Sequence, residues 1–208
     1  MAQFPYSKND RLERALSRGF TIIEVLVAMF VLMIGLVAAG GLVGSTLGNT
    51  TNSQYVNQAA TLATEKLEDL NHYPSIDPHV VAVSGTPSGS LTQDLTQNVT
   101  TTAGTVAIDY YDEVYFSPAQ GALVETGTSL DANGNVQYQT ITYTPDGTIA
   151  TSAYSSTAPN TTSSITFKRR WIIEQDQPIV GVRRVTVQVT LINPVRTPVT
   201  FQMSMVRP

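Results

Sequence analysis

RGFTIIEV, residues 18–25, opens the most apolar run of this 208-residue chain. No residue from Val25 to Val43 is charged, so Glu24 stands alone at the front of the run. A carboxylate within a bilayer costs about 2.5–3.5 kcal/mol even on a lenient insertion scale. We therefore expect Glu24 either to pair with an opposite charge or to have a functional role.

The run is long enough to cross a membrane as a helix. Residues 20–43 would measure about 36 Å at about 1.5 Å per residue, against a hydrocarbon core of about 30 Å. The preceding residues 1–19 carry a net charge of +2 (4 − 2), from Lys8, Arg11, Arg14 and Arg18 against Asp10 and Glu13. A basic head before an apolar span stays in the cytoplasm, which predicts that the chain after Val43 lies outside.

Composition excludes several functions. The net charge of −4 argues against nucleic-acid binding by the whole chain. The chain has no Cys, which excludes disulfides, Cys-type zinc sites, iron–sulfur clusters and thiol catalysis. The two histidines, His72 and His79, flank prolines in a stretch typical of a turn, and no Gly-rich phosphate loop follows a strand. We expect neither an enzyme nor a cofactor.

Three glycines follow each other at four-residue intervals after the apolar run: Gly40, Gly44 and Gly48. This spacing places them on one helix face, where a second helix can approach closely. Each Gly also costs about 1 kcal/mol relative to Ala in a helix, so a flexible exit from the membrane is an equal alternative.

The helix is expected to continue to about His72. An apolar stripe with spacings of three and four predicts an amphipathic continuation; its members are Val56, Ala59, Leu62 or Ala63, Leu67 and Leu70. The charged side chains Glu65, Lys66, Glu68 and Asp69 are expected to face mainly elsewhere. Pro74 is expected to end the helix.

The rest of the chain predicts a β-rich head. Residues 74–104 and 150–164 are expected to be loops, with one short strand at 80–83 in the first. Strands are expected at residues 105–111, 114–117, 136–143, 165–174, 185–191 and 199–205. The last three would form an antiparallel meander whose apolar face packs on the helix stripe. The expected fold class is α+β, a long N-terminal helix packed on a C-terminal antiparallel sheet.

Two polar clusters are weaker candidates for binding sites. Asp131, Asn133 and Asn135 alternate as in a calcium loop, but the twelfth position, where such a loop requires Glu, is Thr142. An Asn-Gly turn between strands is the favoured interpretation.

A run of three basic residues, 168–170, and the pair Arg183 and Arg184 lie on neighbouring predicted strands. They could form a basic patch for nucleic acid. A solvated face, or pairing with nearby acids such as Glu174, is favoured.

Gly19, Phe20 and Glu24, with the apolar residues around them, resemble the processing and methylation motif of type IV prepilins. The resemblance implies that prepilin peptidase cleaves between Gly19 and Phe20 and that the new amine of Phe20 is N-methylated. It also implies that Glu24 pairs with the N-terminal amine of a neighbouring subunit. The chain would then consist of a leader (1–19), a membrane span (20–43), an amphipathic helix (44–73) and a pilin head (74–208).

The helix segment 61–68 and the C-terminal segments 171–173 and 183–190 resemble the minor pilins called type IV pilus modification proteins. This implies a minor pilin in the filament or at its tip, with a role in priming, adhesion or motility. The implied partners are prepilin peptidase, other pilin subunits, the inner-membrane assembly machinery and, before assembly, membrane lipid. The implied location is the bacterial inner membrane, single-pass with the head outside, and then the surface pilus. Alternatives are a type II secretion pseudopilin and a membrane-anchored binding module or adhesin.

Overall fold

A computed structural model describes residues 20–83, 85–101, 104–117, 122–131, 133–144, 148–159, 165–192 and 198–208. The predicted leader, including Gly19, lies outside the described residues. The chain divides into two compact units, residues 1–50 and residues 51–208.

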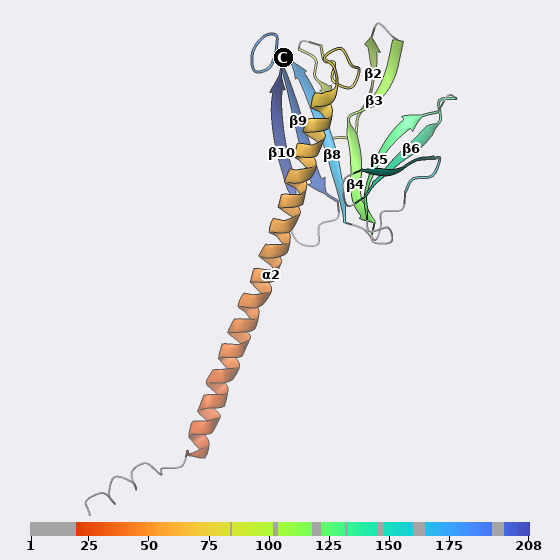
Figure 1. Cartoon of the computed structure of the whole chain (residues 1–208). Helices are drawn as coiled ribbons and strands as arrows, with labels where there is room; N and C mark the ends of the chain where they lie inside the picture. Colours follow the sequence, from red (N-terminus) through yellow and green to blue (C-terminus); the bar gives the residue numbers. More distant parts are fainter. Residues whose placement is uncertain are drawn as a thin grey trace, which may run out of the picture. The chain divides into compact units, whose positions relative to one another are not determined.

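One helix, α2 (Ile22–His72), contributes to both units (Figure 1). It begins after Thr21, whose carbonyl and hydroxyl oxygens accept hydrogen bonds from the Glu24 N–H at 3.0 and 3.3 Å. A Thr cap with Glu three residues later is a strong signal for a helix start. Pro74, which lacks an N–H and cannot continue a helix, follows two residues after the end. The predicted helix is therefore confirmed to within two residues.

In the first unit, α2 is apolar on all sides. Its most apolar 18-residue window has a mean hydropathy of 2.8, and none of that window is buried. By length and composition, this helix can cross a membrane.

In the second unit, α2 carries the predicted stripe. Its buried side chains are Ala59, Leu62, Ala63, Leu67 and Leu70. Only Val56, at the start of the stripe, remains 36% exposed. The spacing of three and four residues thus selects the face that packs on the sheet.

The described residues of the second unit form two antiparallel sheets. The strands are β1 (Ser88–Gly89), β2 (Thr96–Thr101), β3 (Gly104–Asp109), β4 (Tyr111–Ser117), β5 (Ala122–Leu130), β6 (Val136–Tyr143), β7 (Ile149–Ser155), β8 (Thr166–Gln175), β9 (Arg183–Leu191) and β10 (Thr200–Arg207). Seven of them run in the order β10-β9-β8-β4-β5-β6-β7, and β1 pairs with β8; β2 and β3 form a separate hairpin. The α+β fold, a helix on an antiparallel sheet, is as predicted.

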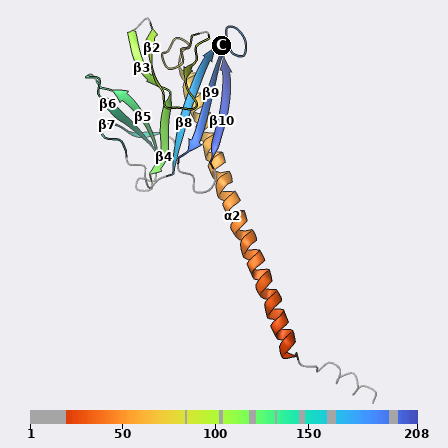
Figure 2. The same ribbon diagram turned by 180° about the vertical axis from the view of Figure 1, so that it is seen from behind.

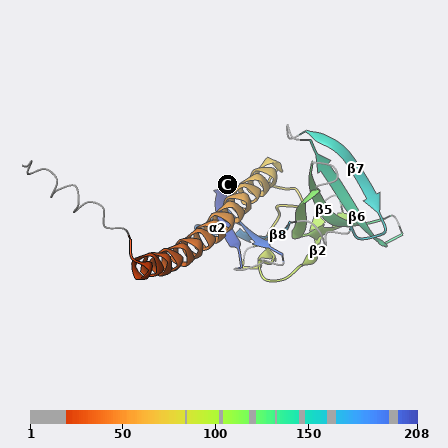
Figure 3. The ribbon, with the colours of Figure 1, turned by 90° about the horizontal axis from the view of Figure 1, so that it is seen from below.

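The core lies between α2 and the β8–β10 end of the sheet, which run alongside each other in two opposite views (Figures 1 and 2). Trp171 lies opposite Val187, and Ile173 opposite Val185, so the alternating apolar residues of both strands meet on one face. All four are at most 5% exposed. Strand β7 is the edge strand at the other end of the sheet from β10, and it is seen from below in Figure 3.

Three predictions about the head are wrong. Residues 74–104 contain β2, and 150–164 contain most of β7, although both were expected to be loops. Residues 80–83 are not a strand: Val80 ends a turn, residues 81 and 82 are irregular, and Val83 makes one isolated bridge. Strand β5 has no counterpart among the predicted strands. These strands are rich in polar residues and lack a regular apolar alternation, so their pairing with neighbouring strands determines their structure.

Candidate functional site

The N-terminal end of α2 presents a single carboxylate within an apolar surface. Phe20 is 81% exposed and Ile22 is 83% exposed. Glu24 follows in the first turn, where the helix dipole favours a negative charge. Among the described residues, no hydrogen bond or ion pair engages the Glu24 carboxylate. The group is therefore available to a partner from another chain.

The predicted glycine face is open in the single chain. A Cβ added at Gly40 or at Gly44 would meet no atom within 4 Å. Gly48, one further turn along, is partly exposed. Neither Gly40 nor Gly44 is required by contacts within this chain, which leaves room for another helix on that face.

At the other end of α2, a buried charge cluster joins the helix to the sheet. We call it the Arg169 cluster; it consists of Lys66, Asp112, Glu125, Tyr143 and Arg169. Arg169 is 1% exposed and donates to both oxygens of Asp112 at 2.6 and 2.7 Å. Its Nη2 also contacts Glu125, whose other oxygen accepts a 2.7 Å bond from Tyr143.

Lys66 brings α2 into the cluster. Its Nζ lies 3.1 Å from Asp112 and 3.3 Å from Asp69. The same nitrogen lies 4.5 Å from the ring centroid of Trp171, a cation–π contact. The expectation that Lys66 faces away from the sheet is therefore wrong, because its aliphatic stem crosses apolar surface before the charge meets its partners.

The cluster is balanced in charge. Burial alone raises the pKa of Asp112, but the charges of Arg169 and Lys66 outweigh burial and hold that pKa below its ordinary value. Burial, the largest single effect, lowers the pKa of Arg169, but Asp112 together with Glu65 and Asp69 outweighs burial and raises that pKa above its ordinary value. Burial also raises the pKa of Tyr143, helped by Glu65 and Asp69. The phenol thus stays protonated as a donor to Glu125.

One feature of the sequence indicates that Arg169 is buried. Phe167, Trp171 and Ile173 alternate along β8, and Arg169 occupies the inward position between the first two. An Arg at an inward position predicts a buried acid opposite it. The sequence does not indicate which acid pairs with Arg169, because Asp112 lies 57 residues away along the chain.

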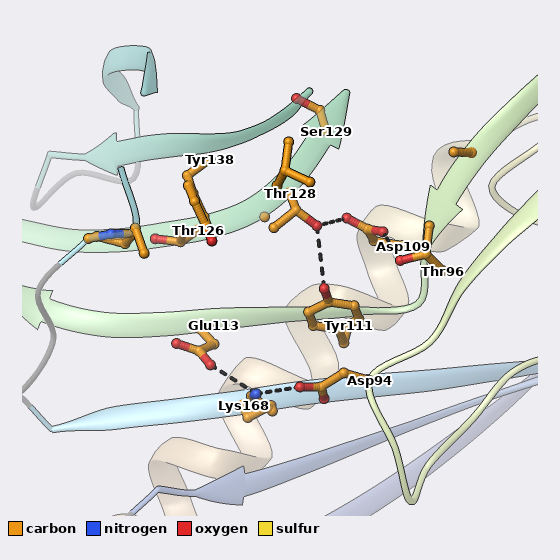
Figure 4. Close-up of a pocket in the computed structure, with 15 residues that line it drawn as sticks. Asp94, Thr96, Asp109, Tyr111, Glu113, Thr126, Thr128, Ser129, Tyr138 and Lys168 are labelled. Atoms are coloured by element: carbon orange, nitrogen blue, oxygen red, sulfur yellow. Dashed lines mark hydrogen bonds and ion pairs between the residues drawn. The ribbon is translucent and has the colours of Figure 1, made fainter. Parts of the chain in front are cut away.

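The basic residues 168–170 are divided between two faces and paired with acids, as the favoured interpretation expected. Lys168 lies 2.7 Å from Asp94 and 3.0 Å from Glu113 (Figure 4). Arg170 also binds Asp94, at 2.8 Å. Arg169 faces the opposite side and is buried. Three neighbouring basic residues therefore do not form one continuous surface.

The second pair is also engaged. Arg184 binds Glu174 at 2.8 Å. Arg183 donates to Gln175 at 2.6 Å and to the carbonyl oxygens of Ser75 and Val80 at 2.5 and 3.2 Å. These contacts tie β9 to its neighbour and to the segment after α2.

Asp131 organises a turn between β5 and β6. Its Oδ1 accepts the backbone N–H groups of Asn133 and Asn135 at 2.9 and 2.8 Å, and its Oδ2 accepts the Asn135 amide at 3.1 Å. Gly134 lies within the turn and has a positive φ of 79°, which Gly adopts without strain. The described residues contain no cluster of three His, Cys, Asp or Glu arranged to hold a metal.

Comparison with known proteins identifies the N-terminal segment. Residues 14–40 match the model of the prokaryotic N-terminal methylation motif. This match includes Phe20, Glu24 and all but the last three residues of the apolar run that ends at Val43. Searches of curated proteins and of solved structures found no match to the chain.

Proposed function

Because the chain carries the N-terminal signature of type IV prepilin-like proteins, we propose that it is a minor pilin of a type IV filament. Prepilin peptidase cleaves between Gly19 and Phe20, and the new amine of Phe20 is methylated. The mature helix holds the subunit in the inner membrane until it enters the filament. One observation carries this proposal: a lone carboxylate in the first turn of a helix that is apolar on all sides, inside the matched motif.

Charge pairing gives Glu24 its role in assembly. An unpaired buried charge is costly, and an opposite charge offsets much of that cost. The methylated amine of Phe20 on one subunit and Glu24 on its neighbour supply such a pair. Entry into the filament therefore relieves a penalty that the subunit carries in lipid, which favours assembly over remaining in the membrane.

The two halves of α2 have different tasks in this proposal. The exposed apolar part exchanges lipid contacts for contacts with neighbouring helices. The part from Thr51 onward, with its stripe and Lys66, stays fixed to the head. The chain then acts as a structural subunit, and its chemistry is carried out by the peptidase and methyltransferase that modify it.

The test is the mature N terminus. We expect protein purified from the native cell to begin with N-methylated Phe20, as read by intact mass and N-terminal sequencing. Gly19→Ala should leave the longer, uncleaved form in the membrane. A mature N terminus at any other residue would falsify the proposal.

A second test separates assembly from processing. Glu24→Leu should be cleaved like wild type but should be missing from sheared filaments. Thr21→Ser is a matched control, since it retains the helix cap while changing a neighbouring residue. Normal incorporation of Glu24→Leu would favour a membrane-anchored binding module whose likeness to prepilins is accidental.

A type II secretion pseudopilin is the second candidate, since the same motif supports it. The two differ in where the assembled protein is found. Recovery in pili sheared from the cell surface supports the minor pilin. Recovery only in the cell envelope, with loss of protein secretion when the gene is deleted, supports the pseudopilin.

A further inference from the structure

Two neighbouring loops expose apolar side chains at the end of the head where α2 stops (Figure 1). One loop follows α2 and carries Ile76; the other joins β8 to β9 and carries Ile179 and Val180. Val180 is 88% exposed and Ile76 81%, the highest values among the large apolar side chains described in residues 51–208, and Ile179 is 66% exposed. Arg183, at the start of β9, joins the loops, because its Nη1 donates to the carbonyl oxygen of Ser75 at 2.5 Å.

Hydrogen bonds fix both loops in these exposed positions. In the loop between β8 and β9, Asp176 Oδ1 accepts the backbone N–H of Gly181 at 2.8 Å. In the loop after α2, Asp77 Oδ1 accepts the backbone N–H of His79 at 2.9 Å and lies 2.6 Å from its Nδ1. A surface that is fixed before a partner arrives loses less entropy on binding.

Two arginines beside these loops have no acidic partner. Arg183 and Arg207 lie directly opposite each other on β9 and β10. Arg207 donates to the carbonyl oxygens of Leu70 and Tyr73 at 2.8 and 2.7 Å, and Arg183 donates to the Gln175 amide oxygen and to backbone carbonyl oxygens. Within the described part of the chain, neither guanidinium forms an ion pair. Their neutral acceptors therefore leave both positive charges without a counter-charge.

The two charges oppose each other across the strands. Like charges directly opposite each other destabilise a sheet. Burial lowers the pKa of Arg183, and the charge of Arg207 lowers that pKa further. Arg183 Nη2 and Arg207 Nε also donate to no atom among the described residues. An anion that accepts hydrogen bonds from these groups would offset the repulsion.

We propose that the Arg183 surface, which consists of Ile76, Ile179, Val180, Arg183 and Arg207, docks an acidic, apolar segment of another protein. A carboxylate of that segment accepts hydrogen bonds from the two guanidinium groups, and its apolar side chains pack on the exposed loop residues and remove them from water. This inference does not depend on the proposed filament function, because it rests only on contacts and charges within the head.

The charge of the head favours a single carboxylate over an extended anionic surface. Residues 51–208 carry a net charge of −5 (8 − 13), so an anionic bilayer or a DNA duplex repels most of the head. Proteins that bind duplex DNA also make roughly 6–10 phosphate contacts, whereas this surface offers two cations. A free inorganic anion would leave the apolar side chains in water. A protein segment that combines one acid with apolar neighbours matches both parts of the surface.

The first experiment titrates the full chain, in a nonionic detergent, with capped peptides that share one apolar frame. The peptides place aspartate, asparagine or lysine between a leucine and an isoleucine, and methyl NMR follows the isoleucine signals of the protein. We expect the aspartate peptide to shift the signals of Ile76 and Ile179 and to leave that of Ile149, an exposed residue of β7, unchanged. Its Kd should be about tenfold lower than that of the asparagine peptide, the weight of one hydrogen bond to a charged group. No shift at millimolar peptide, equal Kd values for these two peptides, or tighter binding of the lysine peptide would overturn the proposal.

Other anions are tested in the same way. The probes are inorganic phosphate and glycerol phosphate, which carries the head-group chemistry of an anionic lipid. We expect neither to shift the Ile179 signal, because neither has apolar side chains to pack on it. A shift at Ile179 with these anions, and none with the aspartate peptide, would identify a different ligand and overturn the proposal.

The second experiment removes one charge from the surface. Arg207→Gln keeps a donor for the carbonyl oxygens at the end of α2, so it should raise the Kd of the aspartate peptide about tenfold and leave that of the asparagine peptide unchanged. Arg184→Gln is the matched control and should bind like wild type, since Arg184 is already paired with Glu174. Unchanged discrimination between the two peptides in Arg207→Gln would overturn the assignment.

A double variant tests the apolar part without changing either arginine. Ile179→Ser/Val180→Ser should fold as stably as wild type, because both side chains are exposed. It should raise the Kd of the aspartate and asparagine peptides together, by about tenfold. Ile149→Ser on β7 is the matched control and should leave both Kd values unchanged. Kd values equal to those of wild type in the double variant would place the peptide elsewhere and overturn the assignment.

Discussion

Arg169 and Asp112 lie directly opposite each other on β8 and β4, with both side chains buried. Nε and Nη2 of the guanidinium reach the two carboxylate oxygens at 2.6 and 2.7 Å. This forked geometry is the strongest that an Arg–carboxylate pair adopts. It lies where the end of α2 meets the sheet, since Lys66 of that helix contacts the same carboxylate.

Removing the arginine should destabilise the head strongly. Arg169→Met keeps most of the side-chain volume but leaves Asp112 and Glu125 with a single cation, Lys66. Breaking a buried ion pair from one side costs about 3–5 kcal/mol. We expect the free energy of unfolding to fall by about that amount, measured by denaturant titration with fluorescence from Trp171, the only Trp in the chain.

Arg184→Met is the matched control for this experiment. Its pair with Glu174 has a similar distance, 2.8 Å, but is solvated, and exposed ion pairs contribute little. Its unfolding midpoint should lie close to that of wild type. A similar small effect from both substitutions would contradict a structural role for the Arg169 cluster.

The same cluster predicts how stability depends on pH. Burial raises the pKa of Asp112, yet Arg169 and Lys66 outweigh it, so the folded value lies below the ordinary 3.8. A carboxyl with a depressed folded pKa stabilises the fold above its unfolded pKa. That stability is lost as pH falls from about 4 toward the folded value.

Acid titration of Asp112→Asn tests this expectation. The variant should be less stable than wild type at pH 6, and the difference should shrink as pH falls below about 4. Denaturant titrations at pH 3 to 6 supply the measurement. A difference that stays constant with pH would mean that the Asp112 charge does not contribute.

The parts of the fold with regular patterns could be predicted from sequence. The stripe of α2 and the alternation along β8 and β9 each predict a buried face, and these faces are found in the core. On β10 the predicted face is buried only in part, because Phe201 and Met205 pack against the core whereas Met203 is 41% exposed. Strand β7 could not be predicted, because all seven of its residues are exposed and no burial pattern marks it. Its pairing with β6 is what makes this segment a strand. The Asp112–Arg169 pair depends on the register of β4 and β8, which no local pattern specifies.

The paired state of the basic side chains predicts weak nucleic-acid binding. Arg183 donates to Gln175 and to two backbone carbonyl oxygens, and Arg184 binds Glu174. DNA affinity arises mainly from cations that are free to neutralise phosphates. The double variant Arg183→Ala/Arg184→Ala should therefore bind duplex DNA as weakly as wild type in low-salt titrations. A clear loss of affinity in the variant would instead support the patch.

Substitutions on the glycine face of α2 can distinguish a role in close helix packing from a role in helix flexibility. A Cβ at Gly44 or at Gly35 would meet no atom within 4 Å, and leaving Gly in a helix costs about 1 kcal/mol. Both Gly44→Leu and Gly35→Leu should therefore fold and be cleaved normally. If close helix contact uses the face of Gly40, Gly44 and Gly48, Gly44→Leu should disappear from sheared filaments. Gly35→Leu, which lies on the opposite side of the helix from Gly44 at about 100° per residue, should be retained. Quantitative immunoblots of sheared and membrane fractions measure this ratio. Equal loss of both variants would indicate that the glycines act through flexibility of the helix, since both substitutions stiffen it alike.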